Sequence, residues 1–184
     1  MCSTLNGLKE NTMASPRALP APSEPVVVLR RALLDQALQV SRDSDRKRVI
    51  LPFHKGPEDN LHRMFNAMQP GTYAQPHRHL TVPKSEVFLL LSGCLDFVVF
   101  DDAGGIELAV RLAAGTDDFG IDLPPGKYHG IVVRAPDTLI YEVKPGPYST
   151  LDDKDFAPWA PAEGTPEVAA YLTGLEASLK QHLS

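Results

Sequence analysis

The sequence predicts a mostly β protein, a single β-barrel of the jelly-roll kind, with a short helix before the barrel and another after it. From residue 49 onward, apolar residues recur in short runs with a period near two, which is the period of a β-strand. The 17 prolines fall mostly between these runs, as in folds whose short strands are joined by tight turns. No helical pattern interrupts the runs, so an antiparallel barrel is favoured over a parallel α/β sheet.

The chain divides into four segments. Residues 1–25 combine Ser, Asn and Pro with few large apolar groups, and we expect a disordered tail without function. Residues 26–48 begin with apolar positions at helical spacing and end in a basic stretch, which predicts an N-terminal helix and a turn. Residues 49–160 form the predicted barrel, and residues 161–184 carry apolar residues at helical spacing, which predicts a C-terminal helix.

Seven runs within the barrel segment are expected to be strands: 49–53, 62–68, 86–91, 94–100, 106–112, 130–134 and 138–143. Turn-forming pairs such as Pro70-Gly71 and Ser92-Gly93 separate them. The run 86–91 is apolar on both faces, whereas a strand with one wet face alternates. We therefore expect its outer face to be covered by the N-terminal helix or by a second copy of the chain in a homodimer.

Charge and composition exclude several classes of protein. The chain has 18 Lys and Arg against 23 Asp and Glu, a net charge of -5, so we expect no nucleic-acid partner. It has no apolar run long enough for a signal peptide or a membrane span, so no membrane partner is expected. Cys2 and Cys94 are far apart, which disfavours a structural disulfide and fits a reducing compartment. These features predict a soluble, cytoplasmic protein.

Four residues form the pattern that carries chemistry: His77, His79, Glu86 and His129. Histidines two apart on an extended chain point to the same side, so both imidazoles can meet one ion. A lone histidine in a strand is usually a satisfied or exposed residue, but His-x-His with a following Glu and a later His after a tight turn seldom occurs by chance. We predict one divalent transition metal per chain, and this ligand set suits Fe, Mn, Ni, Co or Zn without choosing among them.

These residues resemble the two sequence motifs of the cupin superfamily. The first motif is Gly-x5-His-x-His-x3 or 4-Glu-x6-Gly. It is matched by Gly71, His77, His79, Glu86 and Gly93, except that six residues separate His79 from Glu86. The second, Gly-x5-Pro-x-Gly-x2-His-x3-Asn, is matched at Pro124, Gly126 and His129, with Val133 in place of its Asn and Gly120 too close to Pro124. The resemblance implies a cupin barrel with the metal held at these positions.

Most of residues 44–164 is similar to the WbuC family of cupin-fold metalloproteins, in which a long gap before the ligand glutamate is also found. The segments that carry the resemblance are 46–48, 63–65, 70–79, 84–86, 142–148 and, most distinctively, 153–163. That family takes its name from a gene among O-antigen polysaccharide loci. The resemblance therefore implies polysaccharide biosynthesis only by association, and it implies no reaction.

Three further residues are candidates for contact with a small molecule. Lys84 lies two residues before Glu86, Tyr128 adjoins His129, and Arg63 interrupts an apolar strand. Each is expected to bind an anionic or hydroxylated ligand, against the alternative that each is an exposed side chain or a strut of the barrel. In a catalytic reading, Tyr128 and Lys84 would also move protons.

Three histidines and one carboxylate leave open positions on a metal that takes five or six ligands. We therefore expect a small sugar-like or acidic molecule to reach the ion. Two classes of function stay open from the sequence. One is a metal-dependent isomerase or oxygenase, and the other is a non-catalytic sensor or binding module with the same pocket.

Overall fold

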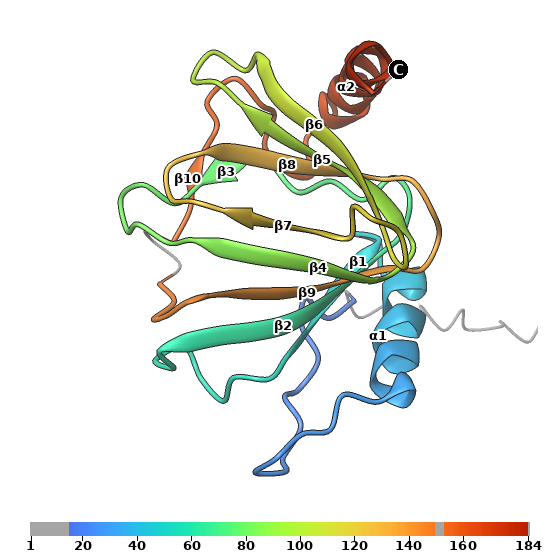
Figure 1. Ribbon diagram of the computed structural model, residues 1–184, viewed down its shortest axis with the longest axis vertical. Helices are drawn as coiled ribbons and strands as arrows, with labels where there is room; N and C mark the ends of the chain where they lie inside the picture. The colour runs from blue at the N-terminus through green and yellow to red at the C-terminus, as the bar shows by residue number, and fades with distance from the viewer. Residues whose placement is uncertain (1–14, 150–152, 184) are drawn as a thin grey trace, which may run out of the picture.

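The computed structural model describes residues 15–149 and 153–183, and within them ten strands form two five-stranded sheets (Figure 1). The strands of the first sheet, in spatial order, are β1 (Arg48–Pro52), β2 (Leu61–Met68), β9 (Thr138–Pro145), β4 (Glu86–Ser92) and β7 (Gly120–Leu123). Those of the second are β10 (Asp155–Phe156), β3 (His77–Arg78), β8 (Tyr128–Val133), β5 (Cys94–Phe100) and β6 (Ile106–Ala113). Neighbouring strands are antiparallel, so the predicted mostly β jelly roll is confirmed.

The main core lies between the two sheets and follows the alternation of the strands. On β5, Leu95, Phe97 and Val99 face the interior, where they meet Phe88 and Leu90 of β4 from the other sheet. The intervening β5 residues face outward. Large apolar side chains therefore fill one part of the barrel interior. Polar residues of the same strands can line the other part.

A helix covers the outer face of each sheet (Figure 1). Helix α1 (Arg31–Asp43) packs Ala37 and Leu38 against β1 and β2. Helix α2 (Val168–His182) packs Leu179 onto the outward residues of β5, together with Trp159. Each helix buries its apolar stripe on a sheet face that would otherwise be exposed to water.

Both helices start later than the segments assigned to them, which begin at residues 26 and 161. Before α1, the β-branched residues Val26, Val27 and Val28 lie outside the helix, and Val26 is 80% exposed. Such side chains lose rotamer freedom in a helix, which opposes a start at residue 26. The segment before α2 contains Pro161 and Pro166, which restrict the chain to turns until Val168.

Part of the expected tail contacts the barrel. Ala18 forms a parallel bridge with Ile50 of β1, and the Leu19 amide donates a 2.8 Å hydrogen bond to the Ile50 carbonyl. Leu19 also packs against the apolar cluster under α1. Because β1 is an edge strand with unpaired backbone groups, it can accept this segment. The expectation of a free tail therefore fails for residues 17–19, while residues 1–14 lie outside the described residues.

Three strands were not expected from the sequence: β3, β7 and β10, of two to four residues each. They are too short to show a period. The β4–β5 hairpin, in contrast, follows from its glycine. Gly93 has a φ of 76°, and a Cβ at this position would lie 2.5 Å from the Thr138 Cα. Only glycine fits both the backbone conformation and the close approach.

The outer face of β4 lies beside the region covered by α1, which packs mainly on β1 and β2. Its outward residues Val87 and Leu89 are half-buried, and Leu91 is 41% exposed. The homodimer stays a prediction for light scattering to test. Neither of the described helices is long and apolar enough to cross a lipid bilayer.

Candidate metal centre

The two sheets bring the four predicted ligands together at one end of the barrel interior. His77 lies on β3 directly opposite His129 of β8, Glu86 begins β4, and His79 follows β3. All four side chains are buried. Candidate ligand atoms of His77, His79 and Glu86 lie within 4.8 Å of one another, and His129 Nε2 is 3.0 Å from Glu86 Oε2.

Backbone carbonyls fix how the imidazoles are turned. The Nδ1 atoms of His77 and His129 each lie 3.1 Å from the carbonyl oxygen two residues earlier, at Gln75 and Lys127. The Nδ1 atom of His79 contacts the Asp153 carbonyl oxygen. A carbonyl oxygen can only accept a hydrogen bond, so each Nδ1 carries a hydrogen, and in a neutral ring the Nε2 atom then presents a lone pair. This is the outer-shell arrangement found around metal-bound histidines.

The site has an unbalanced set of donors and acceptors. His79 Nε2 lies 3.2 Å from Glu86 Oε1, so on both sides of the carboxylate a ring lone pair faces an oxygen lone pair. His79 Nε2 and Glu86 Oε2 are among the buried atoms of the described residues without a hydrogen-bond partner. Buried polar atoms normally have one. A cation between them would satisfy all of these atoms, and the imidazole and carboxylate donors fit a divalent transition metal.

Protonation of the histidines would be the competing way to satisfy Glu86. Burial, with Lys154 nearby, holds the pKa of His77 well below its usual range, so this ring stays neutral. Burial would raise the pKa of Glu86, but hydrogen bonds from His129 and His79 and the charge of Lys144 outweigh it, so its pKa is lowered. The two hydrogen bonds need a proton on Nε2, whereas the Lys144 ammonium also acts on Glu86 when both rings are neutral. Neutral imidazole and ionised carboxylate are the forms that bind metal.

A lysine and two further carboxylates surround the ligand glutamate. The Lys144 Nζ atom is 3.5 Å from Glu86 Oε1, 3.3 Å from Glu142 Oε1 and 3.7 Å from Asp153 Oδ2. Burial would lower the pKa of Lys144, but Glu142, Glu86 and Asp153 together raise it, so the ammonium stays charged. This lysine is therefore fully engaged by the protein.

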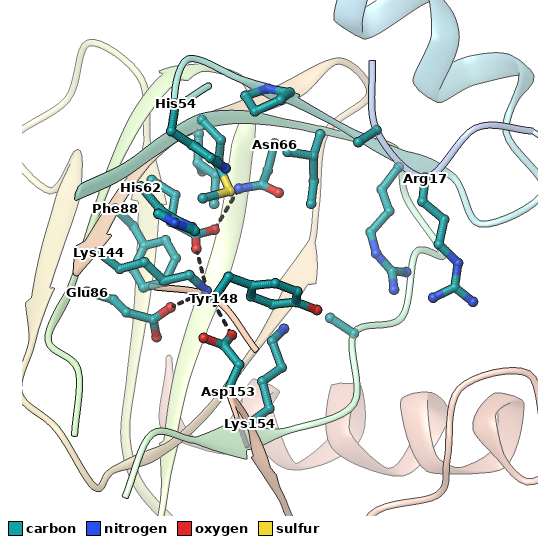
Figure 2. A pocket seen from close by; sticks show the side chains of 18 of the residues that line it. Arg17, His54, His62, Asn66, Glu86, Phe88, Lys144, Tyr148, Asp153 and Lys154 are labelled. Carbon is teal, nitrogen blue, oxygen red and sulfur yellow. Dashed lines mark hydrogen bonds and ion pairs between the residues drawn. The ribbon is translucent and has the colours of Figure 1, made fainter. Parts of the chain in front are cut away.

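A cavity of about 570 Å³ lies beside the four residues and is lined by His77, Glu86 and His129 themselves (Figure 2). This volume is in the range of pockets that hold small molecules. Its apolar wall consists of Met64, Met68, Phe88, Phe97, Ile131 and Ile140. Polar side chains face the same space, among them His54, His62, Asn66, Glu142, Lys144, Tyr148, Asp153 and Lys154. Arg17 lies on the far side of the cavity from Glu86 (Figure 2).

The structure places Lys84 behind the site. Its side chain is 2% exposed, and its Nζ atom donates to Asp153 Oδ1 at 2.5 Å and to the Pro147 carbonyl at 2.6 Å. It is absent from the cavity lining. With both contacts made inside the protein, Lys84 orders the segment around Asp153, whose carbonyl orients His79, and does not reach a ligand.

Tyr128 and Arg63 also point away from the cavity. Tyr128 adjoins His129 on β8, so the two side chains leave opposite faces of the sheet. The Tyr128 ring packs against Trp159 and lies 4.3 Å from the Arg78 guanidinium carbon. Arg63 alternates on β2 with His62 and Met64, which line the cavity, and its Nη2 atom reaches the Phe53 carbonyl at 3.5 Å. Strand parity directs both side chains away from the cavity, contrary to the predicted ligand contacts of Tyr128 and Arg63.

A different tyrosine and a different lysine line the cavity, in place of Tyr128 and Lys84. Tyr148 and Lys154 come from the segment after β9 and line the cavity, as does Asn66, whose Nδ2 donates to Glu142 Oε2 at 2.7 Å. Glu142 and Lys144 are two residues apart on β9, so their side chains share a face of the sheet and are in contact. Tyr148 and Lys154 lie outside long strands, so no periodic pattern pointed to them.

His54 and His62 are near the centre but are not among its ligands. Their rings stack with centroids 4.0 Å apart and an interplanar angle of 11°. His62 Nε2 lies 3.2 Å from the Pro57 carbonyl, and His54 Nδ1 lies near the backbone of Arg63. The pair forms part of the cavity wall.

Comparisons with known proteins support the fold. A family model described as a domain of unknown function (DUF6016) matches residues 29–112, which include His77, His79 and Glu86 but not His129. The comparison with curated proteins gave no match. The solved structure of Cellulomonas parahominis L-ribose isomerase without ligand is similar over 61% of this chain and 70% of that chain, with 16% identity and a TM-score of 0.50.

Two further solved structures are similar at lower scores. KdgF from Halomonas sp. shares 19% identity over 56% of this chain and 79% of its own, with a TM-score of 0.42. The cupin domain of Schizosaccharomyces pombe Cnp3 shares 18% identity over 57% and 67%, with a TM-score of 0.41. At 16% identity, the likeness to L-ribose isomerase bears on the fold alone.

Proposed function

We propose that this cupin-fold chain is a metalloprotein that holds one divalent transition metal through His77, His79, Glu86 and His129. In this proposal the cavity beside the ion binds a small polar molecule whose oxygen atoms complete the coordination. When bound, the metal supplies Lewis-acid polarisation of a ligand oxygen, or a redox centre if it is Fe, Mn, Ni or Co. The chain's own residues then position the rest of the molecule.

The observation that carries the proposal is the orientation of the three histidines. Each ring gives its Nδ1 hydrogen to a backbone carbonyl, and at His79 and His129 the free Nε2 atom faces an oxygen of the ionised Glu86. A network built for stability alone would pair donors with acceptors. This one pairs acceptors with acceptors, which is the arrangement that a cation requires.

The cavity walls support a ligand that is polar on one side. Asn66 and Glu142 offer acceptors for hydroxyl groups, and Phe88 with Ile140 offers an apolar surface for a carbon skeleton. One protein of the same fold, L-ribose isomerase, is by name a sugar enzyme. Since that likeness concerns the fold, we base the sugar-like character of the ligand on the cavity walls. The finer resemblance to the WbuC family is part of this proposal and rests on the sequence segments given above.

Elemental analysis of protein purified without an affinity metal tests the proposal. We expect close to one transition-metal ion per chain in the wild type, and less than about a tenth of that in His77→Ala and in Glu86→Gln. His182→Ala is the matched control, because His182 is exposed on α2 and its Nδ1 atom contacts the carbonyl of Ser178. Folded variants that carry as much metal as the wild type would overturn the ligand assignment.

Turnover separates an enzyme from a binding module. Metal-loaded protein would be incubated with polyhydroxylated aldehydes, ketones and acids, with and without dioxygen, and the products followed by NMR. Isomerised product without dioxygen supports an isomerase, and dioxygen-dependent product supports an oxygenase. Binding without product for Fe, Mn, Ni, Co and Zn supports the sensor or binding module.

A further inference from the structure

We infer that Lys154, together with the Tyr148 hydroxyl, is the anion-recognition element of the cavity, so that the ligand is a polyhydroxylated carboxylate and not a neutral sugar. This inference rests on the proposed metal site and names the substrate class that the site takes. It follows from asking which positive charges near Glu86 are still free to bind a ligand.

Most cations close to the metal centre are already neutralised by the protein. Lys144 is shared among Glu86, Glu142 and Asp153, with Nζ to oxygen distances of 3.3 to 3.7 Å. Lys84 is bound to Asp153 at 2.5 Å and has no surface on the cavity. On the far side, Arg46 and Arg48 both bind Glu163. A ligand would have to compete with these carboxylates for any of the four.

Lys154 is different from these four cations, and unlike Arg17, which lies on the far side of the cavity from Glu86, it lies on the side next to Asp153 (Figure 2). It lines the cavity, yet its ammonium makes no hydrogen bond or ion pair with any described residue. Its side chain is exposed, and its ammonium is directed into the cavity (Figure 2). An ammonium that the protein has not neutralised is available to pair with a ligand. An anionic ligand group would form a charge-assisted hydrogen bond with it, and a neutral group would form a weaker one.

Tyr148 supplies the second donor. Its ring is on the same segment of chain, it lines the same cavity, and its hydroxyl has no partner among the described residues. Figure 2 shows the Tyr148 hydroxyl and the Lys154 ammonium directed into the same space, on the side of the cavity next to Asp153. A planar carboxylate with two oxygens matches one ammonium and one hydroxyl.

The overall charge of the protein makes this local arrangement selective. The chain carries a net charge of -5, so it repels anions at long range. An anion therefore needs a local cation to enter, and Lys154 next to a divalent metal provides one. A phosphoryl group is matched less well, because the bidentate guanidinium surfaces of Arg46 and Arg48 are occupied by Glu163.

Calorimetric titration with a matched pair of probes tests the inference. D-gluconate and D-glucitol differ in that a carboxylate replaces one hydroxymethyl group. For metal-loaded wild type we expect gluconate to bind at least about tenfold more tightly than glucitol. Lys154→Met should remove this preference and leave glucitol binding unchanged. Tyr148→Phe should weaken gluconate by about threefold, and Lys154→Arg should retain most of the preference because the charge is kept.

Lys180→Met is the matched control, because Lys180 is exposed on α2, away from the cavity. Metal content is measured on every sample, so that the two proposals fail separately. A wild type without metal overturns the metal centre and this inference with it. A metal-loaded wild type that binds glucitol as tightly as gluconate, or binds neither, overturns only the inference. The same holds if Lys154→Met keeps the wild-type preference for gluconate in a folded, metal-loaded chain.

Discussion

Two charged clusters line the same cavity, and they differ in how their atoms are matched. In the first, which we call the arginine clamp, Arg46 and Arg48 meet Glu163. Arg46 donates to both carboxylate oxygens at 2.6 and 3.0 Å, and Arg48 donates to the same carboxylate at 2.6 Å and to the Tyr73 carbonyl at 2.5 Å. Each oxygen of the Glu163 carboxylate accepts a hydrogen bond from an arginine. The clamp joins β1 to a segment more than a hundred residues later in the chain.

The second cluster, the metal centre with Lys144 and Asp153, is not matched in this way. Lone pairs of His79 and His129 face Glu86, and His79 Nε2 and Glu86 Oε2 lack hydrogen-bond partners. Similar residue types therefore have different roles in one cavity. The paired charges of the clamp stabilise the fold, whereas the unpaired atoms of the second cluster are placed to bind a cation. Each of the following changes affects one cluster and spares the other.

Removing the metal should have the largest effect. A metal that binds only the folded chain, present at about a thousand times its Kd, stabilises it by about 4 kcal/mol. For a chain of this size that corresponds to roughly 10 °C in Tm. Scanning calorimetry before and after dialysis against a chelator measures the shift. We expect the same shift in Glu163→Gln, where only the clamp is altered, and none in Glu86→Gln. An unchanged wild-type Tm after chelation would contradict the comparison.

Lys84→Met should have the second-largest effect on the stability of the fold. The substitution leaves Asp153 buried without its closest cation, and breaking a buried ion pair costs about 3 kcal/mol or more. Urea unfolding measures this loss. Because no metal donor is changed, we expect metal content per folded chain to stay near that of the wild type. In Lys84→Met with Asp153→Asn, part of the stability should return because no buried charge remains unpaired. A variant of wild-type stability with lower turnover would restore the catalytic reading of Lys84.

Glu163→Gln should have a smaller and pH-dependent effect. Burial would raise the pKa of Glu163, but Arg46 and Arg48 outweigh it and lower the pKa. A carboxylate with a lowered folded-state pKa stabilises the fold above its unfolded pKa, and this stabilisation is lost as the pH falls through the folded value. Since the carboxylate is about one-third exposed, we expect only about 1 kcal/mol at pH 7.

The difference in unfolding free energy between wild type and Glu163→Gln should therefore be constant above about pH 5 and shrink below about pH 4.5. Urea titrations at several pH values give the curve. A difference that grows on acidification would show that the arginines do not stabilise the ionised form.

Tyr128→Phe should have the smallest effect. Its ring packs against Trp159 on the far side of β8 from His129, and the substitution keeps the ring. We expect stability within about 0.5 kcal/mol of the wild type and unchanged metal content and gluconate affinity. Tyr148→Phe is the matched comparison, because of the two tyrosine substitutions only this one should lower the affinity for gluconate. If Tyr128→Phe weakens ligand binding and Tyr148→Phe does not, the orientation of β8 or of the following segment is wrong.

The four candidate metal ligands and most strands could be predicted because their evidence is local. His77 and His79 share a face through the period of an extended chain, and the run from Cys94 to Phe100 coincides with β5. The same period also places Tyr128 and His129 on opposite faces, so strand parity alone could have excluded Tyr128. Arg63 is excluded by the same argument beside His62.

The sequence by itself therefore determined the jelly roll, its two helices and the four residues that converge at the candidate centre. Only the tertiary structure decided which cations are free. Lys84 and Lys154 are similar in sequence, each close to an acidic residue, but one is neutralised by Asp153 and the other faces the cavity without a partner. The physical reason is that periodicity sets the direction of a side chain from its neighbours, whereas the pairing of a charge depends on groups that folding brings from distant parts of the chain.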